Sequence, residues 1–379
     1  MTATEVVVIG GGAIGMSIAY ALAREGVRPA LLDRDALGRG ASWSGAGMIP
    51  PHCERITTNP TTDLRSWSAL LYPEWSEALR DETGIDNGYR RTGGIDVAFT
   101  EDEETELKAA AGRWRAERIV FERLAPGDFA RVEPALTAEA RAVYFLPDRA
   151  QIRNPRHLKA LAAALELRGV ALMPHRRVIG FDVVGGRVRA VRTESGPIGC
   201  DRVVVAAGAW TGELLGDLGV MAPTPPLKGQ IVLLRDDRMP LRRIIEHGKN
   251  YLVPRDDGRI LIGATEEDAG FDNRTTDEAR RDLLAVAHRL CPSLARSEVE
   301  RSWSGLRPGS MDSRPYLGLA PGLENLVVAA GHKRAGLQLA PATAEVIADL
   351  VLGRPTRIDL SAYRIDRPPS MVIDPAFRS

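Results

Sequence analysis

The chain has 379 residues, 44% of them hydrophobic, which is enough to bury a sizeable core and to form two domains. Its 50 basic and 50 acidic residues give a formal net charge of +0, so no polyanion-binding surface is indicated and we expect no nucleic-acid partner. Three scattered cysteines, Cys53, Cys200 and Cys291, are too few for a disulfide framework or a metal site, and they favour a cytoplasmic protein.

The first predicted unit, residues 5–33, has the pattern of a nucleotide-binding βαβ unit. A buried strand runs into the hexapeptide G-x-G-x-x-G, and a helix with one apolar face follows. In that hexapeptide Gly10 allows the tight turn, Gly12 the approach of a pyrophosphate, and Gly15 the packing of helix on strand. Asp33 ends the second strand, at the spacing expected of an acid that binds a ribose hydroxyl. Because a strand, a helix and an acid accompany the glycines, the unit predicts dinucleotide binding. The alternative is an ordinary glycine-rich turn, which does not require this combination.

Residues 37–51 are dominated by small side chains, and we expect them to line a ligand. Such a run lets the backbone pack closely against a flat or charged group. The alternative, a flexible loop, would leave Trp43, Met48 and Ile49 exposed at a cost in free energy.

The middle of the chain alternates between helical and extended patterns. Helices are predicted over 63–83, 102–121 and 155–167, and extended segments over 89–99, 143–154 and 170–205, the last as a β-meander. The apolar positions expected in the core of the first helix are Leu64, Trp67, Leu70, Leu71, Trp75 and Leu79. At 203–211 a buried strand runs into small residues, which again favours close approach of backbone to a ligand.

The last part of the chain continues in the same way. We expect a strand within 223–234, a hairpin over 250–265, a helix over 275–290, strands over 299–308 and 326–330, and a helix over 339–352 with Pro341 in its first turn. No apolar run approaches the ~20 residues that span a bilayer, so no membrane span is expected. A strand that begins by Glu5 leaves no room for a signal peptide.

Four features in this order resemble the amino-acid-oxidising flavoproteins that include D-amino acid oxidase, sarcosine oxidase and glycine oxidase. They are the glycine motif with Asp33, the loop 42–48, the segment 203–211, and the pair formed by 305–308 and 331–336. Two further stretches, 251–255 and 263–267, look most like the bacterial glycine oxidase branch associated with thiamine biosynthesis.

The resemblance implies a mixed α/β fold of the D-amino acid oxidase type, in which a Rossmann-like FAD-binding domain is interleaved with a mixed-sheet substrate domain. The FAD-binding domain is expected over 1–85, 145–220 and 300–370, and the substrate domain over 86–144 and 221–299. FAD is expected to bind non-covalently, because Trp43 stands where the covalent relatives have their histidine, and the cysteine of monomeric sarcosine oxidases is missing from 303–308.

The resemblance also implies which residues contact FAD. They are Gly10, Gly12, Ile14, Gly15, Asp33, Arg34, Ser42, Ala46, Gly47, Met48, Val178 and Gly208, with His332, Lys333, Ala335, Gly336, Leu337 and Gln338 around the flavin ring. Hydride transfer to a flavin builds negative charge on the ring, which backbone N–H groups at a helix start can stabilise.

An amino-acid substrate needs its carboxylate bound, and the planar fork of arginine does this with two hydrogen bonds. Arg307 and Arg334 match the family's substrate-binding positions, and Tyr251 is expected to add its hydroxyl group. The alternatives are solvated arginines and a buried structural tyrosine. No general base is compelling, since His332 is equally suited to orienting the backbone, and a dry site can favour the neutral amine by itself.

Two residues depart from the glycine oxidase pattern. Lys333 stands where an aromatic residue is usual and Ala335 where an asparagine is usual. The lysine places a long cation beside the predicted site, and the alternatives are a changed substrate choice, a changed oxygen reactivity, or a side chain that only points to solvent.

The function implied is FAD-dependent oxidative deamination of glycine, sarcosine or a D-amino acid to a 2-oxo acid and ammonia, with O2 reduced to H2O2. The alternatives are a dehydrogenase that passes electrons to a quinone or other carrier, an NAD-dependent dehydrogenase, which Asp33 permits, and a flavin-binding module without activity. The resemblance also allows a homo-oligomer.

Overall fold

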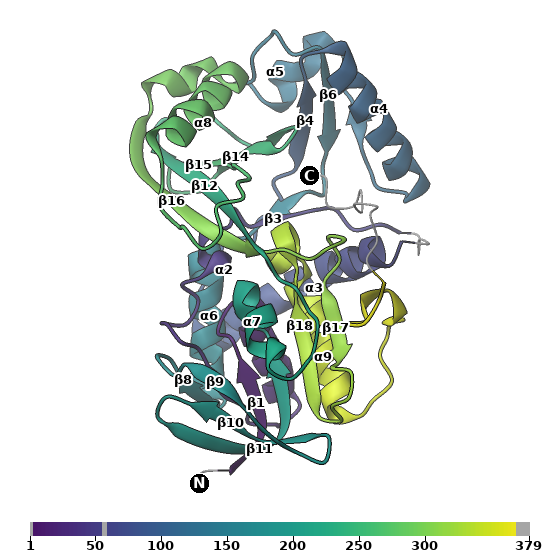
Figure 1. Ribbon diagram of the computed structural model, residues 1–379. Helices are drawn as coiled ribbons and strands as arrows, with labels where there is room; N and C mark the ends of the chain where they lie inside the picture. The colour runs from purple at the N-terminus through teal and green to yellow at the C-terminus, as the bar shows by residue number, and fades with distance from the viewer. Residues whose placement is uncertain (1–2, 55–58, 369–379) are drawn as a thin grey trace.

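The computed structural model describes residues 3–54 and 59–368, and two eight-stranded sheets organise them. The first sheet lies in the lower half of Figure 1 and the second in the upper half. A two-stranded sheet of β3 (Met48–Ile49) and β7 (Ala150–Gln151) is the third.

The first sheet is mainly parallel, with the order β17-β18-β11-β1-β2-β8. Its strands are β1 (Ala3–Ile9), β2 (Ala30–Leu32), β8 (Ala171–Met173), β11 (Gly196–Val205), β17 (Tyr316–Leu319) and β18 (Leu326–Ala330), and β9 (Val178–Val184) and β10 (Arg187–Thr193) join it through β11. Continuous apolar runs such as that of β1 suit strands that are covered on both faces.

Four helices form the largest apolar core with one face of the first sheet. They are α1 (Ala13–Arg24), α3 (Pro60–Thr83), α6 (Asn154–Leu167) and α9 (Gly336–Leu352). The other face packs against β9, β10 and α7 (Thr211–Gly216). α1 is buried nearly all round because it lies between the sheet, α6 and α9.

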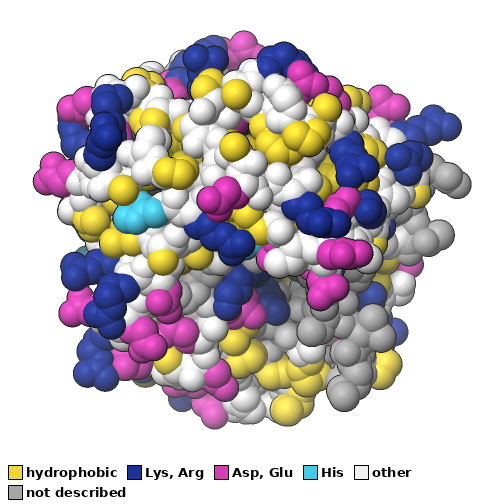
Figure 2. Space-filling model, turned by 90° about the horizontal axis from the view of Figure 1, so that it is seen from above, with side chains coloured by type: hydrophobic (Ala, Val, Ile, Leu, Met, Phe, Trp, Pro, Cys, Tyr) yellow, Lys and Arg dark blue, Asp and Glu magenta, His cyan; other side chains and the backbone are white. Residues whose placement is uncertain are grey.

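The second sheet is mixed, with the order β16-β12-β15-β14-β13-β4-β6-β5, and only β13 and β4 pair in parallel. Its strands are β4 (Gly94–Ala98), β5 (Glu122–Arg123), β6 (Ala142–Leu146), β12 (Pro226–Arg235), β13 (Ile244–His247), β14 (Asn250–Pro254), β15 (Arg259–Gly263) and β16 (Glu298–Pro308). The remaining α-helices are α2 (Ala41–Ser44), α4 (Glu101–Ala116), α5 (Phe129–Val132) and α8 (Asp277–Leu290), and α8 packs on this sheet. Figure 2 shows basic and acidic side chains interspersed over the face seen from above.

The predicted elements exist, with four corrections. The helix predicted over 102–121 is α4, which ends at Ala116, five residues early. Leu70 of α3 is 55% exposed and does not belong to the core. β8 pairs in parallel with β2 and is not part of the β-meander, which starts at β9. α9 begins three residues earlier than predicted, so Pro341 lies inside it and not in its first turn. The predicted domain boundaries stay a prediction, but β16, assigned there to the FAD-binding domain, pairs with β12 in the second sheet.

One helix has the length and composition of a membrane span. Residues 333–352 are long and apolar enough to cross a bilayer, although their sequence contains no continuous apolar run of that length. Because 61% of the most apolar window is buried inside the molecule, this stretch is a core helix of the first sheet.

Pro341 is accommodated inside α9 by a partner from α3. A proline has no N–H group, so it leaves the carbonyl four residues earlier, that of Leu337, without its helical donor. The buried hydroxyl group of Tyr72 donates to that carbonyl oxygen. The contact ties α3 to the first turn of α9, where the cavity described below begins.

Candidate active site

A cavity of about 760 Å³ lies between the two sheets. It is lined by the carboxyl ends of β1, β2, β11 and β18, by the start of α9, and by β16 of the second sheet. The carboxyl ends of parallel strands are where open α/β sheets bind their ligands, because the chain turns away there and leaves a crevice.

The glycine motif fits a dinucleotide because it brings backbone to the cavity wall. Gly10 has φ +110°, and a Cβ atom there would lie 2.2 Å from the Ala206 carbonyl oxygen, so only glycine fits. A Cβ atom at Gly15 would lie 1.8 Å from the Gly10 carbonyl oxygen, so α1 can begin against the strand only with glycine at this position. Gly12 is the N-cap of α1 and has no side chain of its own to obstruct a diphosphate at the helix start.

Asp33 and Ser42 fix this end of the cavity. The Asp33 carboxylate accepts from the backbone N–H groups of Gly11, at 2.7 Å, and Asp35, at 2.8 Å. Burial raises the pKa of Asp33, and the two backbone donors oppose that shift. The Ser42 hydroxyl oxygen accepts from the N–H group of Ala13 at 2.8 Å, so it holds the loop against the start of α1.

The loop that contains Ala46 is held by an arginine of the second sheet. Arg255 donates to the Ala46 carbonyl oxygen at 2.6 Å and to the Ile152 carbonyl oxygen at 3.1 Å. Burial lowers the pKa of Arg255 to about 10, so its cation persists at neutral pH. Its role is to position the backbone that lines the cavity.

At the opposite end, His332 and the start of α9 form the wall. The imidazole of His332 is buried with Nε2 3.3 Å from the Thr343 hydroxyl oxygen, and burial lowers its pKa to about 3. A neutral ring with this partner is suited to orienting the backbone of the turn, which is one of the two roles predicted for His332; the other is that of a general base. α9 starts at Gly336, so the N–H groups of its first turn are at the cavity.

Lys333 does not point freely into solvent. Its ammonium nitrogen lies 3.4 Å from the Ser313 hydroxyl oxygen and 4.0 Å from a carboxylate oxygen of Glu266, with the side chain 17% exposed.

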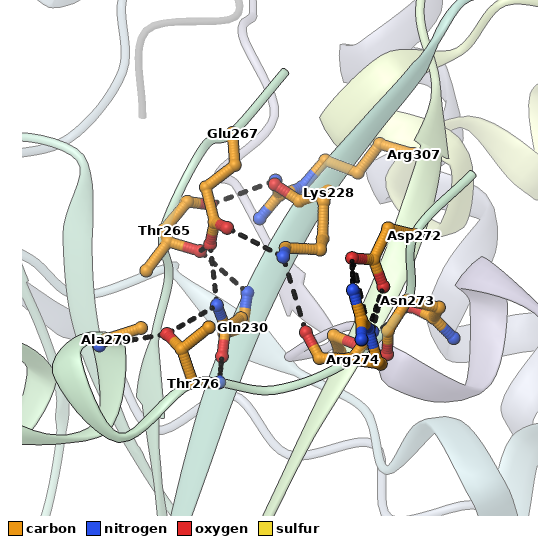
Figure 3. Close-up of polar contacts among 11 residues, drawn as sticks. Lys228, Gln230, Thr265, Glu267, Asp272, Asn273, Arg274, Thr276, Ala279 and Arg307 are labelled. Carbon is orange, nitrogen blue, oxygen red and sulfur yellow. Dashed lines mark hydrogen bonds and ion pairs between the residues drawn. The ribbon is translucent and has the colours of Figure 1, made fainter. Parts of the chain in front are cut away.

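Arg307 lies flat against the backbone of a neighbouring strand. A Cβ atom at Gly229 would be 2.2–2.4 Å from three atoms of the Arg307 guanidinium. Nη1 donates to the carbonyl oxygens of Thr265, at 3.1 Å, and Lys228, at 3.4 Å, as Figure 3 shows. Burial lowers the pKa of Arg307, and no carboxylate of the described residues forms an ion pair with it. A half-buried cation that lacks a carboxylate ion-pair partner is suited to bind an anion.

Two further groups accompany Arg307. The Tyr251 ring of β14 lies over Gly263, where a Cβ atom would be 2.4 Å from the hydroxyl oxygen. Burial raises the pKa of Tyr251, while Arg307 and Arg334 act against that shift, so its hydroxyl group stays protonated. Arg334 donates to the Lys249 carbonyl oxygen at 3.2 Å and lines both this cavity and a neighbouring one of about 520 Å³.

The cavity brings together every predicted site residue except Gly15, which lies behind the wall. Their contacts with cofactor and substrate stay predictions. Sequence reasoning missed Gly229, Trp210 and Asn273, which also line the cavity. The small residues at 203–211 were a signal for Trp210, whereas nothing in the sequence singles out Asn273.

Comparisons with known proteins agree with this site. The family DAO, described as FAD dependent oxidoreductase, matches residues 5–350. The chain is 38% identical over 360 residues to the glycine oxidase of Pseudomonas aeruginosa, covering 95% of this chain and 98% of that protein. The crystal structure of glycine oxidase from Geobacillus kaustophilus is similar with a TM-score of 0.93 and 33% identity, covering 98% and 100% of the two chains. The bifunctional protein ThiO/ThiG of Synechocystis sp. is 34% identical over 358 residues, covering 93% of this chain and 52% of that protein.

Proposed function

Because the chain belongs to the DAO family of FAD-dependent oxidoreductases, we propose that it oxidatively deaminates a small amino acid or amine of the glycine type. Its cofactor is FAD, and its donor is a CH–NH2 or CH–NH group. FAD held in this cavity would supply the hydride-accepting chemistry, with O2 as the final electron acceptor and H2O2 as its product. Water then hydrolyses the imine to a 2-oxo acid, with release of ammonia from a CH–NH2 donor or of a primary amine from a CH–NH donor. The family assignment excludes the alternative of an NAD-dependent dehydrogenase.

The observation that carries the proposal is the unpaired guanidinium of Arg307. Its Nη1 is occupied by two backbone carbonyl groups, so Nε and Nη2 remain for the carboxylate of the substrate. Tyr251 supplies a protonated hydroxyl group near the same carboxylate, and Arg334 a second cation at the cavity wall.

The same residues favour loss of the amine proton. The cations of Arg307 and Arg334 both lie at the cavity, and they disfavour a third cation, the ammonium form of the substrate. His332 is neutral and turned to Thr343, so it is not the base in this proposal. The N–H groups at the start of α9 would stabilise the negative charge that hydride transfer builds on the flavin ring.

We further propose non-covalent FAD and a cytoplasmic location. Trp43 lines the cavity where covalent relatives have histidine. The three cysteines are all free, as a reducing compartment favours. A connection to thiamine biosynthesis rests on the similarity to ThiO/ThiG proteins.

The test is anaerobic addition of glycine, sarcosine or a D-amino acid to the purified holoenzyme while the visible flavin spectrum is followed. The flavin band should bleach with one of them, and admission of air should restore it with release of H2O2. Restoration only by a quinone or other carrier would identify the dehydrogenase alternative, and an unbleached flavin would contradict the proposal.

Arg307→Ala tests the carboxylate site. Loss of a charged hydrogen-bonding partner, about 1.5–3 kcal/mol, should lower kcat/KM for the substrate by roughly ten- to a hundredfold with FAD still bound. Arg301→Ala, an exposed arginine of the same strand, is the matched control and should leave kcat/KM unchanged. Equal activity in both variants would show that Arg307 does not bind the carboxylate.

A further inference from the structure

Residues 264–276, which connect β15 to α8, contact the wall of the cofactor cavity at several separate places; we refer to them as the β15–α8 connection. The Thr265 carbonyl oxygen accepts from Arg307 at 3.1 Å, and Glu266 lies 4.0 Å from Lys333. Asn273 lines the cavity itself, and its side-chain oxygen accepts from the Ser304 hydroxyl group of β16 at 2.8 Å. The connection therefore follows the cavity from the substrate end towards the nucleotide end.

Both ends of the connection are fixed to β12, as Figure 3 shows. Lys228 is 4% exposed, and its ammonium nitrogen lies 2.8 Å from the Glu267 carboxylate. The backbones of these two residues also exchange hydrogen bonds, at 3.0 and 2.9 Å. Gln230 donates to the Glu267 carboxylate at 2.8 Å and accepts from the Thr276 N–H group at 2.8 Å. Because the ends are fixed, the residues between them have a defined position over the cavity wall.

The polar contacts of the β15–α8 connection do not explain why an aromatic side chain, that of Phe271, stands at its surface. The side chain is 50% exposed and belongs to none of the apolar cores. Its ring stacks on Trp210 with the ring centroids 5.2 Å apart and an angle of 28° between the planes. Trp210 in turn contacts Arg34, whose guanidinium carbon lies 3.4 Å from the Trp210 ring centroid. Trp210 and Arg34 both line the cavity, next to Asp33.

The series Arg34, Trp210, Phe271 joins three segments that are far apart in the chain. Arg34 follows β2, Trp210 follows β11, and Phe271 belongs to the β15–α8 connection. A tryptophan in contact with a guanidinium and with an aromatic ring is attracted to both, through the quadrupole of its ring and through stacking. The indole is therefore held as a wall of the cavity at the nucleotide end, and removal of Phe271 removes one of its two supports.

We propose that the β15–α8 connection retains FAD in the cavity, and that Phe271 is a positioning residue that acts through Trp210. The inference rests on flavin binding, which the family assignment provides, and is independent of which amine is oxidised. In this arrangement the indole of Trp210 and the guanidinium of Arg34 obstruct the departure of the nucleotide. The same connection also holds the carbonyl group that orients Arg307.

The experiment measures the release of FAD from the holoenzyme after dilution, followed by the rise in free-flavin fluorescence. Phe271→Ala should speed release by roughly three- to tenfold, the factor expected for the loss of one aromatic pair. Phe271→Tyr keeps the stacked ring and should release FAD as slowly as the unchanged protein. Leu319→Ala removes an apolar side chain of the same exposure, 50%, far from Trp210 in the sequence, and is the matched control. Release from Phe271→Ala at the control rate would overturn the proposal, as would fast release from Phe271→Tyr.

A double-mutant cycle tests whether Phe271 acts through Trp210. In the Trp210→Ala background, Phe271→Ala should add no further acceleration of FAD release. If Phe271→Ala accelerated FAD release equally with and without Trp210, the inference that Phe271 acts through Trp210 would be overturned. The melting temperature of the flavin-free protein should be the same for Phe271→Ala and Leu319→Ala, and a selective drop for Phe271→Ala would make its role structural. If the protein retains FAD in this way but oxidises no amine, the proposed function is contradicted and the role of Phe271 in FAD retention is not.

Discussion

A methyl group at Gly229 should disable the substrate site without unfolding the protein. Gly229 lies in the extended backbone of β12, so alanine is acceptable there conformationally. Its Cβ atom would, however, lie 2.2 Å from Nη2, 2.3 Å from Nη1 and 2.4 Å from Cζ of Arg307. The atoms in conflict belong to the end of a flexible side chain, so the guanidinium moves and the strand pairing is kept.

The magnitude follows from these distances. Ordinary contact begins near 3.4 Å, so the guanidinium has to retreat by about 1 Å from its present position. Its bond of 3.1 Å to the Thr265 carbonyl oxygen is then lost, and with it the orientation of Nε and Nη2. A displacement of about 1 Å, or the loss of one charged hydrogen bond of about 1.5–3 kcal/mol, corresponds to roughly a ten- to hundredfold lower kcat/KM.

The assay compares kcat/KM for glycine, the flavin content and the melting temperature of Gly229→Ala with those of the unchanged protein. Only kcat/KM should fall. Gly112→Ala is the control, because a Cβ atom at Gly112 in α4 meets nothing within 4 Å. In the Arg307→Ala background the same substitution should have no effect, since the displaced group is absent. Unchanged kcat/KM in Gly229→Ala, or an equal loss in the Arg307→Ala background, would refute the reasoning.

Two further predictions concern stability. Tyr72→Phe leaves the carbonyl group of Leu337 without its donor inside α9. In urea denaturation it should lower the free energy of unfolding by about 1–3 kcal/mol. The control is Tyr89→Phe, whose ring stacks on Tyr72, and an equal effect of the two substitutions would show that the Tyr72 hydroxyl group contributes nothing. The buried imidazole of His332 has a pKa of about 3 against an ordinary value of 6.5, so the unfolded chain binds the extra proton between these values and stability rises with pH across that window. At pH 5 the loss relative to neutral pH should be about 2 kcal/mol for this group, and His332→Gln should reduce the measured pH dependence of unfolding by that amount; an unchanged slope would contradict the assignment.

Several elements could be predicted because their signals are local. The glycine motif, the helix after it and Asp33 lie within 33 residues, and turn geometry and helix periodicity act over such distances. The hairpin of β14 and β15 and the helix α8 appeared as predicted for the same reason. The glycine motif and Asp33 follow from local spacing and the other site residues from the resemblance, and all but Gly15 line one cavity.

Strand partners and helix limits were harder to predict. β16 had a clear strand pattern, but its pairing with β12 depends on hydrogen bonds between segments about 70 residues apart, which no local pattern encodes. The alternating pattern of residues 170–205 predicts one β-meander that includes β8, whereas the partner of β8 is β2. Pro341 indicated a first turn, because a proline deeper in a helix needs a compensating donor that only folding can supply.

The sequence by itself determined that a dinucleotide-binding unit stands at the start of the chain, and it determined which residue types are available to the site. The tertiary structure alone decided how those residues act on one another. The guanidinium of Arg307 is oriented by Gly229 and Thr265, and Trp210 is held between Arg34 and Phe271. These contacts join residues from different sheets and loops, and their energies depend on distances of a few ångströms. Such distances exist only after the chain has folded.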